Sequence, residues 1–118
     1  EKFMIRFILN HDYVILDNEH VICSKSKFIK AFLLHTPDQD LSPEQISRLN
    51  SVHCKYTIDL KEFHSQTFTD ICENLKSENR FQTFDLVEIA MMWSYLELPE
   101  ERLKEVYPII LLKTYLKT

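Results

Sequence analysis

The spacing of apolar residues predicts three short strands. Residues 3–9 read FMIRFIL and residues 13–16 read YVIL, and both runs are rich in β-branched and aromatic side chains. The Asn-His-Asp turn at residues 10–12 separates them, and Asn and Asp tolerate left-handed backbone, so a hairpin is expected. Residues 55–60 (KYTIDL) alternate polar and apolar positions, which predicts a third strand.

Apolar residues at helical spacing predict the remaining elements. Residues 24–34 predict one short amphipathic helix, and Ser65 is suited to cap a second helix with an apolar face. A short capped helix is expected at 42–49, and further helices at 85–96, 100–106 and 109–116. The apolar face of the helix after Ser65 is expected to carry Phe68, Ile71, Cys72 and Leu75.

Strands and helices are segregated along the chain, which indicates an α+β fold with a small three-stranded sheet flanked by helices. The 118 residues fit one domain, and their apolar content of 45% supplies a core without disulfides or metal. We expect residues 1–98 to form the domain and residues 99–118 to form a C-terminal helical extension.

Charge and composition exclude several classes of protein. The net charge of -4 and the lack of a dense basic cluster argue against nucleic-acid binding. The longest apolar runs, 89–93 and 109–112, are too short to span a membrane. Glycine is absent, so phosphate-binding loops and a GxSxG nucleophile motif are excluded. Three cysteines, an odd number without a CxxC pair, predict reduced thiols in a cytoplasmic or nuclear protein.

Candidate catalytic residues are few. The five histidines are dispersed without metal-ligand spacing, so we expect no metal and no cofactor. Cys72 lies on an apolar helix face, where a buried and inert thiol is expected rather than a nucleophile. The sequence therefore predicts a protein without enzymatic activity, and a thiol enzyme built on Cys72 is the rival from another class.

The segment 85–98 is more apolar than one buried helix face requires. Its surplus apolar residues are Met91, Met92, Trp93, Tyr95, Leu96 and Leu98. One interpretation is an internal core helix. The other is a groove for a partner, because Met adapts to varied surfaces and Trp and Tyr are frequent interface anchors.

Three segments, in order, resemble the elongin C family of the BTB/POZ superfamily. Residues 19–24 (EHVICS) and 29–33 (IKAFL) are similar to the family's EHALTS and IKAML. Residues 58–63 (IDLKEF), followed by residues 65–72, are similar to its VNFREI and SHVLSKVC. Residues 87–96 are similar to its LELLMAANFL helix. The resemblance covers residues 3–98, and the related F-box adaptors also carry C-terminal helices.

The resemblance implies a BTB/POZ fold and an adaptor that bridges a cullin scaffold and a substrate receptor in ubiquitin ligases. It also implies elongin B-like partners and a receptor helix, the BC box, that inserts into an apolar pocket. By position that pocket would use Asn74, Ile89, Trp93, Tyr95 and Leu98. The cullin-facing loop would use Thr36, Asp38, Asp40 and Leu41.

The chain departs from the family at the pocket. The family has an aromatic residue where Asn74 stands and a small residue where Trp93 stands, so we expect a reshaped pocket or one that residues 99–118 fill in cis. A homo-oligomerising BTB scaffold of a transcriptional or receptor protein is the alternative. Such domains usually add an N-terminal helix and strand, and this chain starts directly with its first strand, which favours the adaptor.

Overall fold

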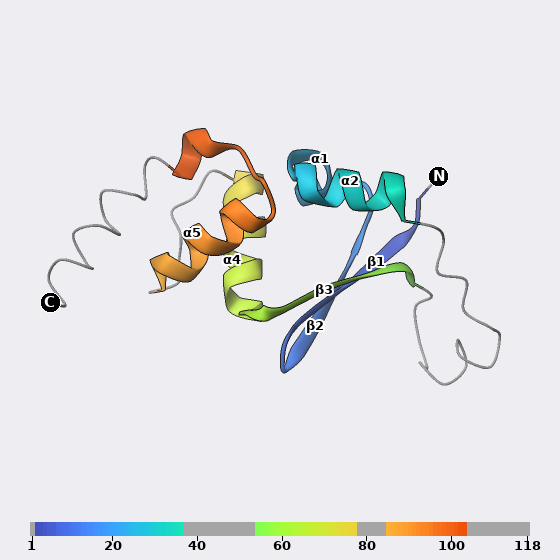
Figure 1. Ribbon diagram of the computed structural model, residues 1–118, viewed down its shortest axis with the longest axis horizontal. Coiled ribbons are helices and arrows are strands. Elements are labelled where there is room, and N and C mark those ends of the chain that lie inside the picture. The colour runs from blue at the N-terminus through green and yellow to red at the C-terminus, as the bar shows by residue number, and fades with distance from the viewer. Residues whose placement is uncertain (1, 37–53, 78–84, 104–118) are drawn as a thin grey trace, which may run out of the picture.

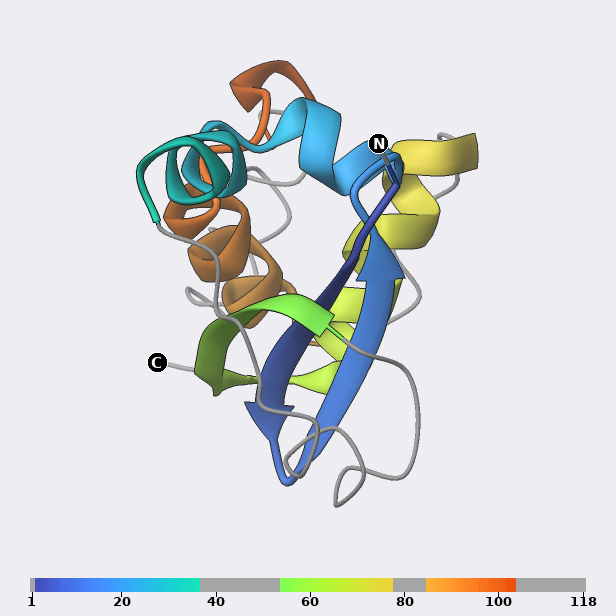
Figure 2. The ribbon, with the colours of Figure 1, turned by 90° about the vertical axis from the view of Figure 1, so that its right-hand side faces the viewer.

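A computed structural model describes residues 2–36, 54–77 and 85–103 of the chain. Its strands are β1 (Met4–Asn10), β2 (Asp12–Asp17) and β3 (Cys54–His64). Its helices are α1 (Val21–Lys25), α2 (Lys27–His35), α4 (Ser65–Ser77) and α5 (Leu86–Tyr95), and a further helical turn begins at Glu100. Two views show the β1–β2 hairpin projecting away from the helices (Figures 1 and 2). The predicted α+β class and the three-stranded sheet are confirmed.

The sheet has the strand order β2-β1-β3. β1 pairs with β2 in an antiparallel hairpin and with β3 in parallel, so Phe7 lies opposite both Val14 and Ile58. The hairpin turn was predicted on the tolerance of Asn and Asp for left-handed backbone. In the structure His11 takes that conformation, with φ of 61°. His is among the few non-glycine residues enriched there, and the chain has no glycine to offer.

Two predicted elements have different bounds. β3 runs from Cys54 to His64, well past the predicted end at residue 60. The alternation of buried positions shifts there, because Lys61 and Glu62 are both exposed before the buried Phe63, and the pairing with β1 has a register shift before Asn10 meets His64. The helix predicted at 24–34 is present as α2, but it begins at Lys27, and a separate short helix, α1, precedes it on the other side of Ser26. The Ser26 hydroxyl caps α2 by accepting from Ile29 N at 3.0 Å.

The core lies between the sheet and the helices. Phe7 of β1 contacts Phe68 of α4 with ring centroids 4.9 Å apart, and neither is accessible to solvent. The predicted apolar face of α4 is confirmed, since Ile71, Cys72 and Leu75 are buried with Phe68. Among the described residues the fully buried large side chains are Trp93, Phe7, Phe68, Ile5, Leu9, Ile22, Ile29, Ile58, Leu60, Ile71, Ile89 and Met92.

Several predictions lie outside the described residues. These are the helices at 42–49 and 109–116 and the part of the helix at 100–106 beyond residue 103. Among the helices of the described ranges, none is both long and apolar enough to cross a membrane.

Candidate functional site

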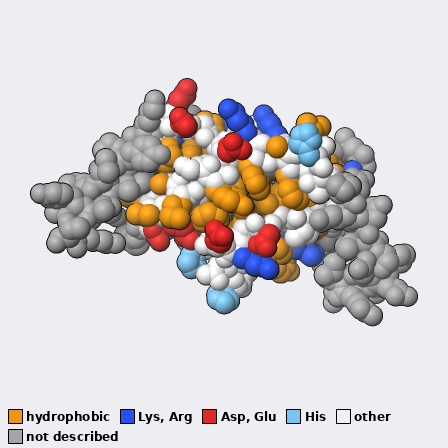
Figure 3. Space-filling view, viewed as in Figure 1, with side chains coloured by type: hydrophobic (Ala, Val, Ile, Leu, Met, Phe, Trp, Pro, Cys, Tyr) orange, Lys and Arg blue, Asp and Glu red, His pale blue; other side chains and the backbone are white. Residues whose placement is uncertain are grey.

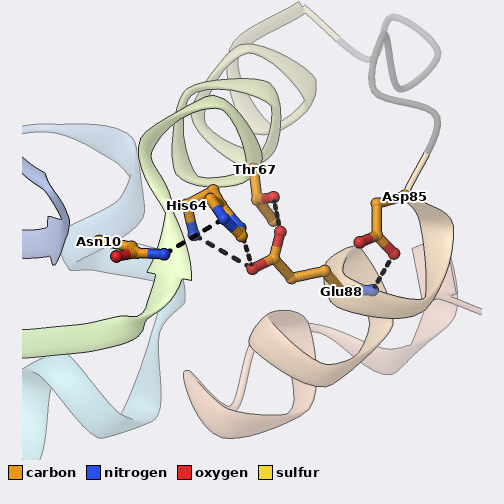
Figure 4. A network of polar contacts seen from close by, with 5 residues as sticks. All are labelled: Asn10, His64, Thr67, Asp85 and Glu88. Carbon is orange, nitrogen blue, oxygen red and sulfur yellow. Dashed lines mark hydrogen bonds and ion pairs between the residues drawn. The ribbon is translucent and has the colours of Figure 1, made fainter.

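The start of α5 is tied to the start of α4 through one carboxylate. Asp85 caps α5, with its Oδ1 accepting from Glu88 N at 3.0 Å. The Glu88 side chain then crosses to α4, where it accepts hydrogen bonds from the Thr67 hydroxyl and from His64 N, the latter at 3.1 Å (Figure 4). Glu88 thereby satisfies a backbone N–H at the N-terminus of α4, which has no partner within its own helix.

His64 extends this network to the hairpin. Its Nδ1 lies 2.9 Å from Glu88 Oε1 and its Nε2 lies 3.2 Å from the Asn10 amide nitrogen. A neutral ring that carries its proton on Nδ1 satisfies both contacts, because it donates to the carboxylate and accepts from the amide. The network (Asn10, His64, Thr67, Asp85 and Glu88) therefore connects β1, β3, α4 and α5 (Figure 4).

The surroundings of Glu88 favour its ionised form. Burial disfavours the charge, but hydrogen bonds from Thr67 and from the ring and backbone of His64 outweigh burial and leave the pKa of Glu88 lowered. A carboxylate that is ionised and fully engaged in a helix cap is a structural element rather than a general acid. The network accordingly fixes the position of α5.

The end of α5 is held by a Schellman motif without glycine. Glu97 takes the left-handed conformation with φ of 51°, the position that glycine most often occupies. Its N–H donates to Ser94 O and the N–H of Leu98 donates to Trp93 O, both at 3.1 Å. These bonds satisfy carbonyl groups of the last turn and direct the chain back across α5.

The same end is joined to the α1–α2 corner. The buried Ser26 hydroxyl donates to Leu96 O at 2.6 Å, and Phe28 N donates to the same carbonyl at 3.4 Å. Lys27 N donates to Glu97 O at 3.3 Å. Since N–H groups at the start of α2 meet carbonyl groups at the end of α5, the two helix dipoles align favourably. α5 is thus fixed at both of its ends.

The structure brings the predicted groove residues together, but mostly as core. Ile89 and Trp93 have no exposed surface, and Leu98 and Asn74 are buried. Tyr95 alone of the five is exposed, at 46%, and its ring packs against Phe28 and Phe63. The predicted groove is therefore closed in this structure, and a binding role for its buried members stays a prediction.

The segment after α5 covers these residues. Trp93 Nε1 donates to Pro99 O at 2.7 Å, and Arg102 donates to the backbone carbonyl and side-chain oxygen of Asn74. Leu103 is buried. The described part of the expected C-terminal extension thus packs in cis on the residues that the resemblance assigned to the pocket.

The predicted cullin-facing loop is described only at its first residue. Thr36 ends α2, is half-buried, and donates its N–H to Phe32 O at 3.0 Å. Asp38, Asp40 and Leu41 lie outside the described residues. The cullin role of this loop remains a prediction.

The outer face of α5 carries an apolar stripe that the sequence reasoning only partly identified. Val87, Met91 and Tyr95 follow one another at intervals of four residues and are exposed at 46%, 61% and 46%. Met91 and Tyr95 were among the surplus apolar residues of this segment, whereas Val87 was missed. The spacing of four was the signal that would have found it.

Small residues lie beside the stripe on α5. Ala90 and Ser94, also four apart, line with Met91 and Tyr95 a shallow hollow of about 560 Å³. Tyr95 also borders a second hollow of about 360 Å³, lined by residues 59–63. Hydrophobic side chains gather over the part of the surface where α5 lies and continue toward the middle of the molecule (Figure 3).

The three cysteines are buried thiols without a disulfide. Burial raises the pKa of Cys72 to about 12 and that of Cys23 to about 11, and it also raises the pKa of Cys54. Such thiols are poor nucleophiles at neutral pH. In the described ranges no three His, Cys, Asp or Glu side chains come together in a way that could hold a metal ion.

No family model matches the chain, and no curated protein matches it. The class that the structure defines is a small α+β domain with a mixed three-stranded sheet.

Proposed function

We propose that the protein is a non-enzymatic interaction adaptor, similar to elongin C within the BTB/POZ superfamily. The observation that carries the proposal is the stripe Val87–Met91–Tyr95 on the outer face of α5. Three large apolar side chains in one row, each about half exposed, form a surface that a partner protein would remove from water. The described residues place the stripe on a helix fixed at both ends, as a preformed binding surface requires.

The positions of the three matching segments support the proposal. The described elements run as a hairpin, a helix pair, a strand parallel to the first, and a further helix pair. The three matching segments fall on α1 and α2, on β3 with α4, and on α5. The proposal therefore keeps a helical receptor motif as one partner and a cullin-like or elongin B-like protein as another.

The proposed binding surface differs from the pocket that the resemblance implies. Trp93 fills the core beneath α5, and residues after Leu96 cover that side. The partner is accordingly expected on the opposite, outward side of the helix. Of the five residues first assigned to the groove, Tyr95 is the one that both surfaces share.

Affinity purification of the tagged chain from cells tests the adaptor proposal. The parent is compared with Met91→Glu on the stripe and with Leu34→Glu on α2, where Leu34 is exposed at 79%. We expect partner proteins that Met91→Glu loses and Leu34→Glu keeps, with both variants folded. Equal recovery of the same proteins with all three chains would contradict the proposal. A stripe-dependent dimer in light scattering would instead favour the homo-oligomerising BTB scaffold.

A further inference from the structure

The stripe on α5 has the form of one half of a helix–helix contact. Val87, Met91 and Tyr95 make a ridge along the i, i+4 direction, and Ala90 and Ser94 make a parallel row of small side chains beside it. Helices pack by placing the ridge of one into the groove of the other. A partner helix with large apolar residues four apart would seat them in the hollow over Ala90 and Ser94.

The charge along α5 and the segment after it, up to residue 101, has one sign, and beside Tyr95 the second hollow also holds Asp59, Glu62 and one cation, Lys61, which pairs with Asp59. Residues 85–101 include five carboxylates and no lysine or arginine. Glu88 is turned toward α4, whereas Asp85, Glu97, Glu100 and Glu101 are exposed. Asp85 and Glu97 adjoin the two ends of α5, whereas Glu100 and Glu101 belong to the segment that follows it. The last turn of α5 also lacks a basic residue.

We infer that the occupant of the stripe is a basic amphipathic helix of a partner protein, with an apolar row flanked by lysine or arginine. This inference rests on the proposed adaptor function and specifies the chemistry of its partner. A second copy of the chain is disfavoured, because antiparallel packing of two α5 helices would bring Asp85 of one beside Glu97 of the other. Lysine flanks on a partner would lie beside the same carboxylates and reduce their mutual repulsion.

Two synthetic 18-residue peptides test the inference directly. Both carry the same leucine and alanine stripe, one flanked by lysines and the other by glutamates, and both are titrated into the full chain. We expect the lysine peptide to bind at least ~10-fold more tightly at low salt, with the difference shrinking as salt is added. Equal binding, or tighter binding of the glutamate peptide, would overturn the inference.

Variants of the full chain separate a specific site from general attraction between opposite charges. Met91→Glu makes the protein more acidic, so general attraction would increase. At the proposed site the substitution removes an apolar anchor, so the affinity for the lysine peptide should fall at least ~10-fold. Leu34→Glu adds the same charge elsewhere and should leave binding unchanged. The double variant Asp85→Lys/Glu97→Lys should reverse the preference between the two peptides.

Other occupants give different results in the same experiment. Residues 104–118 combine an apolar run with lysines at 104, 113 and 117. If that segment occupied the stripe, it would compete with the peptide. Peptide binding to the double variant Lys113→Glu/Lys117→Glu, with none to the parent, would therefore assign the stripe to the chain's own segment and overturn the inference. A cellular partner whose binding requires Met91, but which contacts it through a neutral or acidic segment, would contradict the inference of a basic helix. The proposed adaptor function would be unaffected.

Discussion

The indole Nε1 of Trp93 donates a hydrogen bond of 2.7 Å to the carbonyl oxygen of Pro99. This bond joins the most deeply buried aromatic residue of α5 to the segment that returns across the helix. The bond lies on the inner face of α5, where Trp93 and Ile89 are buried, whereas Met91 and Tyr95 on the outer face are exposed. Substitutions on the inner face should change stability, and substitutions on the outer face should change partner binding, so the two effects can be measured separately.

The inner face is expected to determine stability. Trp93→Ala should lower the free energy of unfolding by about 3–5 kcal/mol, because it removes a buried aromatic side chain and leaves the Pro99 carbonyl without the indole N–H. Chemical denaturation followed by circular dichroism measures the change. A folded variant with the parent's stability that loses its partner would restore Trp93 as a binding anchor and contradict the core assignment.

The left-handed residue at the end of α5 offers a stabilising substitution. Glu97→Gly should raise the free energy of unfolding by roughly 0.5–1 kcal/mol, because glycine takes φ near 51° without a steric penalty from Cβ. Glu97→Ala at the same position removes the same carboxylate but keeps the Cβ. If both variants gain stability equally, the effect arises from charge rather than from backbone conformation.

Acid should weaken the tie between α4 and α5. The pKa of Glu88 is lowered in the folded state, so its contribution to stability is present above the ordinary value of 4.5 and is lost as the pH falls through the lowered value. Glu88→Gln should cost about 1–3 kcal/mol at neutral pH and should show a smaller further loss on acidification. Unfolding curves between pH 7 and pH 3 compare the two proteins. Parallel pH profiles would show that Glu88 is not linked to folding.

The thiols are expected to be unreactive in the folded protein. Because burial raises the pKa of Cys72 and Cys23, the thiolate fraction at neutral pH is very small. Iodoacetamide should label the native chain slowly and the unfolded chain quickly, as read by intact-mass spectrometry. Stability should not change with dithiothreitol. Rapid native labelling of Cys72 would support the thiol enzyme instead.

The elements with a regular spacing of apolar residues were predicted from the sequence. Features that depend on contacts between distant parts of the chain were not. The hairpin, β3 and the face of α4 alternate or repeat at regular spacing, and each was found. The break at Ser26 was missed, although serine is a common capping residue, and the bond of its hydroxyl to Leu96 O, 70 residues away in sequence, has no local signal. The parallel pairing of β1 with β3 is likewise a long-range feature with no local signal.

The candidate site was harder to predict for a related reason. α5 is apolar almost all round, so its sequence does not distinguish the inner residue Trp93 from the outer residue Met91. The distinction appears only in the tertiary packing, in which Trp93 joins the core and donates to Pro99 O. The carboxylate of Glu88 was also missed, because its partners Thr67 and His64 lie on another helix and at the end of a strand.

Site-specific photo-crosslinking at position 91 is the most direct test of the central claim that the outer face of α5 binds a partner. A photoreactive residue replaces Met91 in the full chain, and in a control it replaces Leu34. We expect irradiation in cells to give an adduct with another protein from position 91 and not from position 34. Adducts confined to the chain itself or to a second copy, or the same adducts from both positions, would contradict the claim.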